Sequence, residues 1–93
     1  MLTLLTLKLY LAGCSSLNEK RSRLQPVLKR VHKEFNVSIS EIGLQDVLQS
    51  SWIGIALVSN ENTYNEQLLN KISIFIESNW PGEQILESHL ERR

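Results

Sequence analysis

The sequence predicts a single α+β domain over residues 1–93, in which two helices pack on one face of a four-stranded antiparallel sheet. Three observations predict this class. Apolar and polar residues alternate near the N-terminus, as in a half-buried strand. Two later segments carry apolar residues at helical spacing, and strand-like apolar runs lie between and after them. A chain of 93 residues with 42% hydrophobic content is long enough for one core and too short for two.

The first strand is expected from Leu2 to Leu11. Its leucines at alternate positions would face the core, and Tyr10 would lie on the other face with Thr6 and Lys8. Ser16 and Glu19 then have the spacing of a capping box, which predicts a helix beginning near Leu17.

Pro26 falls inside this first helix, where it removes a backbone hydrogen bond and clashes with the preceding turn. It predicts a kink. The alternative is a helix broken into an N-terminal turn and a main body.

The second strand is expected around Val37 to Ile39, with a bulge near Glu41 because Ile42 is out of phase. Its partner is Trp52 to Val58, which is apolar on both faces and is therefore expected at the centre of the sheet. The small residues of that strand are expected to meet the helices. Its other face, with Ile53, Ile55 and Leu57, is then expected to be open.

Thr63 and Glu66 form a second capping-box pattern, and Asn79-Trp80-Pro81-Gly82 ends the helix that it opens. A last strand is expected from Glu83 to about Leu90. The order βαββαβ predicts a ferredoxin-like two-layer sandwich.

The charges of the chain cancel, with ten basic and ten acidic side chains, but they are unevenly distributed. The first helix carries a basic cluster, which could contact the phosphates of RNA or could be an ordinary solvated face. The candidate residues for RNA or partner binding are Lys20, Arg21, Arg23, Lys29, Arg30 and Lys33.

An open apolar sheet face predicts a homodimer, because monomers seldom leave such a patch bare. The candidate dimer face consists of Tyr10, Ile53, Ile55 and Leu57. Stacking of RNA bases on the sheet is disfavoured, because Tyr10 and Trp52 are the only aromatic residues expected on the strands.

We expect no enzyme. The candidate groups Cys14, His32, Asp46 and His89 fall on different elements, with no spacing that predicts a nucleophile beside a base. Because these groups are few and far apart in the sequence, we also expect no metal and no cofactor. A single cysteine fits a reducing cytoplasm, and no apolar run approaches the roughly 20 residues of a membrane span.

A second interpretation of the N-terminus is a lipoprotein signal, since Leu11-Ala12-Gly13-Cys14 has the form of a lipobox. Cys14 would then be lipidated and the preceding residues removed. The absence of a basic side chain from Met1 to Leu7 and the alternation of the segment favour a strand.

Several groups of residues, at fixed spacings, together form a pattern that is specific enough to indicate a family. They are Ser16-Leu17 with Lys20-Arg21, Phe35-Asn36-Val37-Ser38 with Glu41, Gln45-Asp46 with Gln49, and Gly54, Ala56, Val58, Ser59 and Asn60. In this order they resemble the YlxP-like family of small bacterial proteins, whose domain has no established activity. The sequence departs from the family pattern at Gln25, where the family has a basic residue, and at Leu48, Gln49 and Ser50, where it usually has tryptophan, glutamine and arginine.

The resemblance implies a ferredoxin-like fold. It also implies a link to translation, because genes of the family often neighbour those for translation initiation and ribosome maturation. The leading hypothesis is a non-enzymatic cytoplasmic accessory protein of translation or ribosome maturation that docks its first helix on RNA or a ribosomal partner. The alternative is a homodimeric ligand-sensing or structural module.

Overall fold

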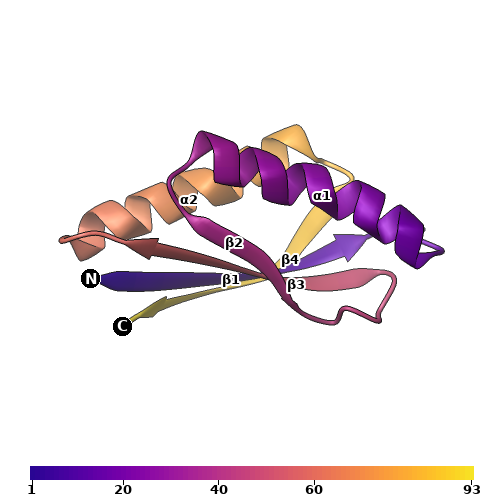
Figure 1. Ribbon diagram of the computed structural model, residues 1–93, viewed down its shortest axis with the longest axis horizontal. Coiled ribbons are helices and arrows are strands. Elements are labelled where there is room, and N and C mark those ends of the chain that lie inside the picture. Colours follow the sequence, from indigo (N-terminus) through magenta and orange to yellow (C-terminus); the bar gives the residue numbers. More distant parts are fainter.

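The computed structural model describes residues 1–93 and has two layers, with both helices on one side of a single sheet (Figure 1). All neighbouring strands are antiparallel, in the order β2-β3-β1-β4. The ferredoxin-like prediction is therefore confirmed. The elements are β1 (Leu2–Leu11), α1 (Leu17–Glu34), β2 (Ser38–Gly43), β3 (Ser50–Val58), α2 (Asn62–Asn79) and β4 (Glu83–Arg92).

Strand β1 lies at the centre of the sheet, between β3 and β4. Its odd-numbered residues from Thr3 to Leu11 are buried beneath the helices, and the residues between them are only partly covered. The alternation in the sequence is thus the alternation of a strand with one buried face. Removal of the chain before Cys14 would take away this central strand and the leucines that it contributes to the core.

Strand β3 buries the face that the sequence predicted to be open. Ile53, Ile55 and Leu57 are 0%, 0% and 4% exposed, so the prediction that they form an open dimer face is wrong. Residues directly opposite in an antiparallel pair share a face. Ile53 is paired with Leu7 and Ile55 with Leu5, and all four therefore point at the helices.

The small residues of β3 lie on the open face instead. The predicted bulge is present between Glu41 and Gly43, and the side chain of Ile42 lies over Gly54. A Cβ at Gly54 would come within 3.1 Å of two carbons of Ile42. The glycine therefore makes room for a neighbour on the open face and not for a helix.

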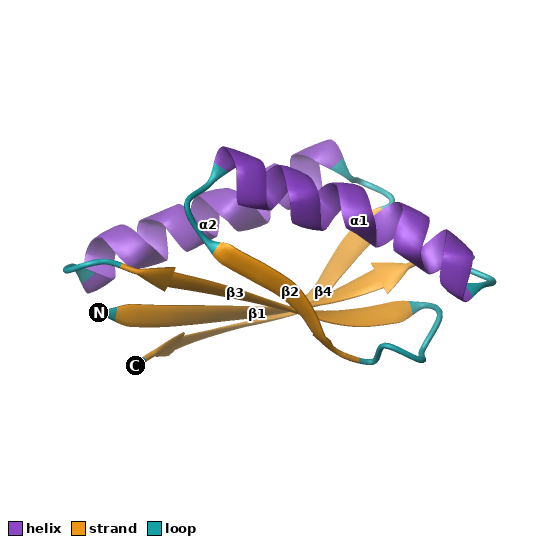
Figure 2. Cartoon of the chain, viewed as in Figure 1, coloured by secondary structure: helices purple, strands orange, loops and turns teal.

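Helix α1 begins at Leu17, as predicted, and the Ser16 side chain accepts a hydrogen bond from Glu19 N at 3.1 Å. The helix continues unbroken through Pro26, so the alternative of a broken helix is wrong. Figure 2 shows it as one coil above β2.

Helix α2 begins at Asn62, and its N-cap residue Glu61 makes no side-chain capping bond. The capping box predicted for Thr63 and Glu66 is therefore wrong. Glu66 pairs with Arg92 at the end of β4, and this hydrogen bond lowers the pKa of the Glu66 carboxyl despite the opposing effect of desolvation.

The buried position of Ile53 gives a direct test. Because Ile53 fills the core between the sheet and the helices, we expect Ile53→Ala to lower the free energy of unfolding by about 3 kcal/mol in denaturant titrations. The matched control is Val58→Ala on the same strand. Val58 is 73% exposed, so its change should stay within about 0.5 kcal/mol. Equal effects of the two substitutions would contradict the assignment of faces.

Candidate functional site

Lys20 lies inside the protein, although it belongs to the basic cluster of α1. The residue is 2% exposed, and its Nζ donates to the carbonyl oxygens of Leu44 at 2.7 Å and Val47 at 2.6 Å. Nζ also lies 3.0 Å from the Glu41 carboxylate. The expectation that Lys20 forms part of a surface for RNA is therefore corrected, because its donors are used within the chain.

The Lys20 ammonium holds the loop between β2 and β3 in place. Leu44 has a φ of 61°, a left-handed conformation that costs a non-glycine residue of the order of 1 kcal/mol or more. Ser51 Oγ donates to Glu41 at 2.6 Å, so the carboxylate that faces Lys20 is itself fixed. A sequence signal for this burial existed, since position 20 continues the core stripe of Leu24, Val27 and Val31 by one turn.

We call Lys20 with its bonds to Leu44, Val47 and Glu41 the Lys20 clamp. A cleft of about 230 Å³ lies beside it, between α1, β2 and the loop from β2 to β3. Six of its nine lining residues are among those that carry the resemblance described above, which places them around one hollow. The lining residues are Leu17, Lys20, Arg21, Leu24, Gln25, Leu28, Glu41, Gln45 and Asp46.

A second hollow of about 290 Å³ lies further along the same helix and also contacts Leu28. It is lined by Leu28, Lys29, His32, Ser38 and Ile39. The two hollows share Leu28 and follow one another along the seam between α1 and β2. We name these two hollows together the α1–β2 groove.

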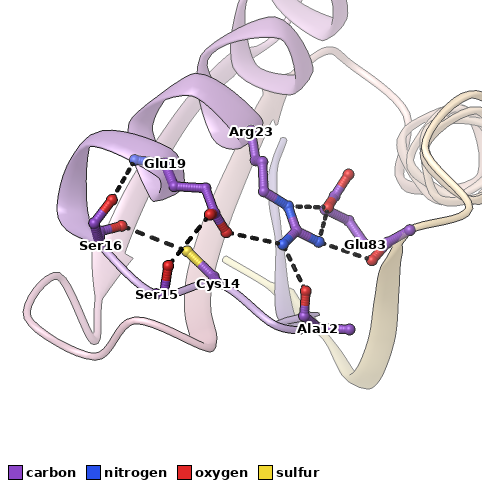
Figure 3. A network of polar contacts seen from close by, with 8 residues as sticks. Ala12, Cys14, Ser15, Ser16, Glu19, Arg23 and Glu83 are labelled. Carbon is purple, nitrogen blue, oxygen red and sulfur yellow. Dashed lines mark hydrogen bonds and ion pairs between the residues drawn. The ribbon is translucent and has the colours of Figure 1, made fainter.

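Arg23 is also engaged within the chain, on the opposite flank of α1. Its Nε donates to Glu83 at 2.7 Å and its Nη1 to the Ala12 carbonyl at 2.7 Å, while Cys14 and Glu19 lie close by (Figure 3). Burial opposes the charged guanidinium, but the hydrogen bond and the charge of Glu83 outweigh it, so the pKa of Arg23 lies above its ordinary value. Arg23 therefore ties α1 to β4 and to the loop after β1.

The four remaining basic residues of the predicted cluster are exposed. Arg21, Lys29 and Lys33 have no acidic partner within 4 Å. Arg30 packs over the rings of Phe75 and Trp80, at 5.1 and 5.5 Å from their centroids, and makes a hydrogen bond to Asn79. The cluster thus divides into two internal cations and four exposed ones.

The open face of the sheet carries Tyr10, as predicted, together with the even-numbered residues of β3 in place of Ile53, Ile55 and Leu57. Trp52 lies opposite Lys8, whose ammonium is 5.8 Å from the indole centroid, and His89 lies beside the same ring. Lys8 also pairs with Glu87 at 3.7 Å.

The four groups weighed as catalytic candidates are not joined by any hydrogen bond or ion pair. Cys14 is buried in the loop after β1, and His32 Nδ1 lies 3.1 Å from the Val37 carbonyl. Asp46 lines the groove, and His89 is on β4. The structure holds no group of three or more His, Cys, Asp and Glu side chains placed to bind a metal ion. Neither helix combines the length and the apolar character that crossing a membrane requires.

Two comparisons with known proteins agree on the kind of protein. A family model described as "Protein of unknown function (DUF503)" matches residues 2–89. The uncharacterized protein YlxP of Bacillus subtilis (strain 168) is 49% identical over 70 residues, which cover 75% of this chain and 74% of that protein. The match of the family model begins at residue 2 and so includes the whole of β1.

The clamp at Lys20 predicts a specific loss of stability. Lys20→Met keeps an unbranched side chain that lacks only the terminal ammonium, so that the Leu44 and Val47 carbonyls lose their donor and Glu41 loses its counter-ion. We expect the free energy of unfolding to fall by about 3 kcal/mol. We also expect faster amide exchange in the loop between β2 and β3.

The matched control is Arg21→Met, which removes an exposed cation from the adjacent position and should change stability by less than about 0.5 kcal/mol. A Lys20→Met protein as stable as Arg21→Met would show that the clamp contributes nothing.

Proposed function

Because this chain belongs to the DUF503 family of proteins of unknown function, we propose a role for it from its surfaces. It is a non-enzymatic accessory protein of translation or ribosome maturation that binds RNA through the exposed positive face of α1. The observation that carries the proposal is the set of exposed cations with no acidic partner, Arg21, Lys29 and Lys33. Arg30 extends this set on the flank of α1 that faces α2.

The spacing of these cations suits contact with a phosphate backbone. At 1.5 Å per residue, Arg21 and Lys33 are separated by about 18 Å along the helix axis. Lys29 and Lys33 are four residues apart and therefore lie on the same side of the helix. An RNA strand along this face could contact several phosphates at once.

The neutral net charge of the chain does not oppose such binding, because the charges are separated in space. The imbalance lies on α1 itself, which carries six lysines and arginines and only two acidic residues, Glu19 and Glu34. The field close to this helix is therefore more positive than the net charge of the chain indicates.

Salt dependence tests the proposal. With fluorescently labelled ribosomal RNA fragments, about four phosphate contacts should give a slope of about −3 for the logarithm of the binding constant against the logarithm of salt concentration. The double variant Lys29→Glu with Lys33→Glu should weaken binding at least tenfold and flatten that slope.

Lys71→Glu is the matched control, since Lys71 is an exposed, unpaired lysine on α2. It should leave binding within twofold. Absence of binding at low salt, or an equal loss with the control, would remove the proposal.

A second candidate is a homodimeric ligand-sensing or structural module that associates through the open face of the sheet. It is supported by the apolar side chains that this face exposes, among them Ile42 at 53% and Val58 at 73%. Leu4 and Ala56 lie opposite each other on the two central strands and continue the same surface. A second copy would cover this patch.

Sedimentation equilibrium tests the dimer. We expect a monomer–dimer equilibrium that Ala56→Glu shifts at least tenfold toward the monomer, because the substitution places a charge at the centre of the patch. Gln67→Glu adds the same charge on an exposed site of α2 and should leave the equilibrium unchanged. A protein that stays monomeric at millimolar concentration would exclude this candidate.

A further inference from the structure

We propose that the α1–β2 groove binds an extended peptide segment of a partner protein, which adds to the free edge of β2 as a fifth strand. This proposal concerns a different ligand from the RNA proposed above and does not depend on it. It rests on three features of the structure: an unpaired strand edge, a groove beside that edge with Leu24, Leu28 and Ile39 among its lining residues, and the charges at the two ends of the groove.

The hydrogen bonds at the ends of β1 and β3 establish which backbone groups face which neighbour. Ser59 N donates to the Met1 carbonyl at 2.9 Å, and Leu11 N donates to the Gln49 carbonyl at 2.8 Å. The odd-numbered residues of β3 therefore bond to β1. Since backbone groups alternate in direction along an antiparallel strand, the even-numbered residues of β3 bond to β2.

The partners of those even-numbered residues are Ser38 and Ser40, which are paired with Ala56 and Gly54. Ile39 and Glu41 consequently turn their N–H and C=O groups away from β3, toward the outside of the sheet. β2 is an edge strand, and no backbone hydrogen bond outside the ladders involves either residue. Their outward N–H groups are therefore free to pair with an added strand.

The α1–β2 groove lies directly beside this free edge. Side chains of Ile39 and Glu41 point toward the helical layer and line the groove, together with Leu24 and Leu28 of α1. Every second side chain of an added strand would point the same way, into the groove. Apolar side chains at alternate positions of the peptide would therefore pack on the leucines of α1, while its backbone pairs with Ile39 and Glu41.

The ends of the groove differ in charge. Lys29 is the charged side chain at the end next to Ser38 and Ile39, where no acidic side chain lines the hollow. At the other end the lining carries both signs of charge, among them Arg21 and Asp46. The occupant that fits is a peptide with apolar residues at alternate positions and an acidic residue near Lys29.

The outward N–H groups of Ile39 and Glu41 favour a peptide over RNA, because the carbonyls of an added strand match their repeat and a sugar-phosphate chain does not. The Glu41 carbonyl itself accepts a hydrogen bond from Ser40 Oγ. A second copy of this chain would offer its own β2 edge, but the Glu41 carboxylate on that edge is already held by Lys20 and Ser51 and supplies no free acidic group for Lys29. RNA and a second copy are therefore outcomes that the experiment has to separate.

The probe is a phage-displayed library of random nine-residue peptides, selected against the whole chain. We expect enrichment of peptides with alternating apolar residues and at least one acidic residue. A synthetic peptide from this selection should slow amide exchange at Ile39 and Glu41 at least tenfold. Failure of the selection, or protection confined to other strands, would overturn the proposal.

The decisive variant is Ile39→Pro, which deletes the outward N–H and leaves the bonds of Ser38 and Ser40 to β3 in place. It should weaken the selected peptide at least tenfold. Ile39→Val keeps the N–H, makes the same side chain smaller, and should stay within twofold. Equal affinity of the two variants would exclude strand addition. Where Ile39→Pro does not fold, the exchange measurement on the natural sequence decides alone.

Two further arms identify the competing occupants. A twelve-nucleotide single-stranded RNA that protects Ile39 and Glu41 in the same way would assign the groove to RNA and overturn the peptide. Protection that rises with protein concentration in the absence of peptide would assign the edge to a second copy. Under the proposal, neither is observed.

Discussion

The pairing register of the two central strands is the constraint on which the rest of this structure depends. Leu5 opposite Ile55 and Leu7 opposite Ile53 place four large side chains on one face, and this face becomes the core beneath both helices. A shift by one residue would turn every side chain of β3 to the other face. The register therefore also decides which residues remain on the open face to meet water or a second copy.

The helical side of the domain is organised by two cations that serve the fold. Lys20 holds the loop after β2, and Arg23 joins α1 to the beginning of β4 through Glu83. Both lie on flanks of the helix that face the protein, so that the remaining cations of α1 point to solvent. The division between internal and external charge follows from the angular positions on one helix.

The domain has two distinct sides that could recognise partners, and they do not share residues. On the helical side, the exposed cations of α1 border a groove next to the unpaired edge of β2. On the other side, Trp52, Ala56 and Val58 lie on an open and partly apolar sheet. A second copy on the open face can therefore be tested apart from the ligands of the helical side. RNA and the peptide share Lys29, and Ile39→Pro is the substitution that tests the peptide strand.

Local patterns in the sequence were enough to predict the order of elements, the start of α1, the inner position of β3 and the bulge in β2. These features follow from local signals: the periodicity of apolar residues, the capping residue Ser16, and the change in the phase of that periodicity at Ile42. The sequence could not decide which apolar face of β3 was buried, because both faces are apolar and only the pairing with β1 distinguishes them. Tertiary structure also decided the roles of Lys20 and Arg23, since the carbonyls and carboxylates that bind them come from segments distant in the chain. The α1–β2 groove arises for the same reason, from the packing of a helix against an edge strand that no local pattern describes.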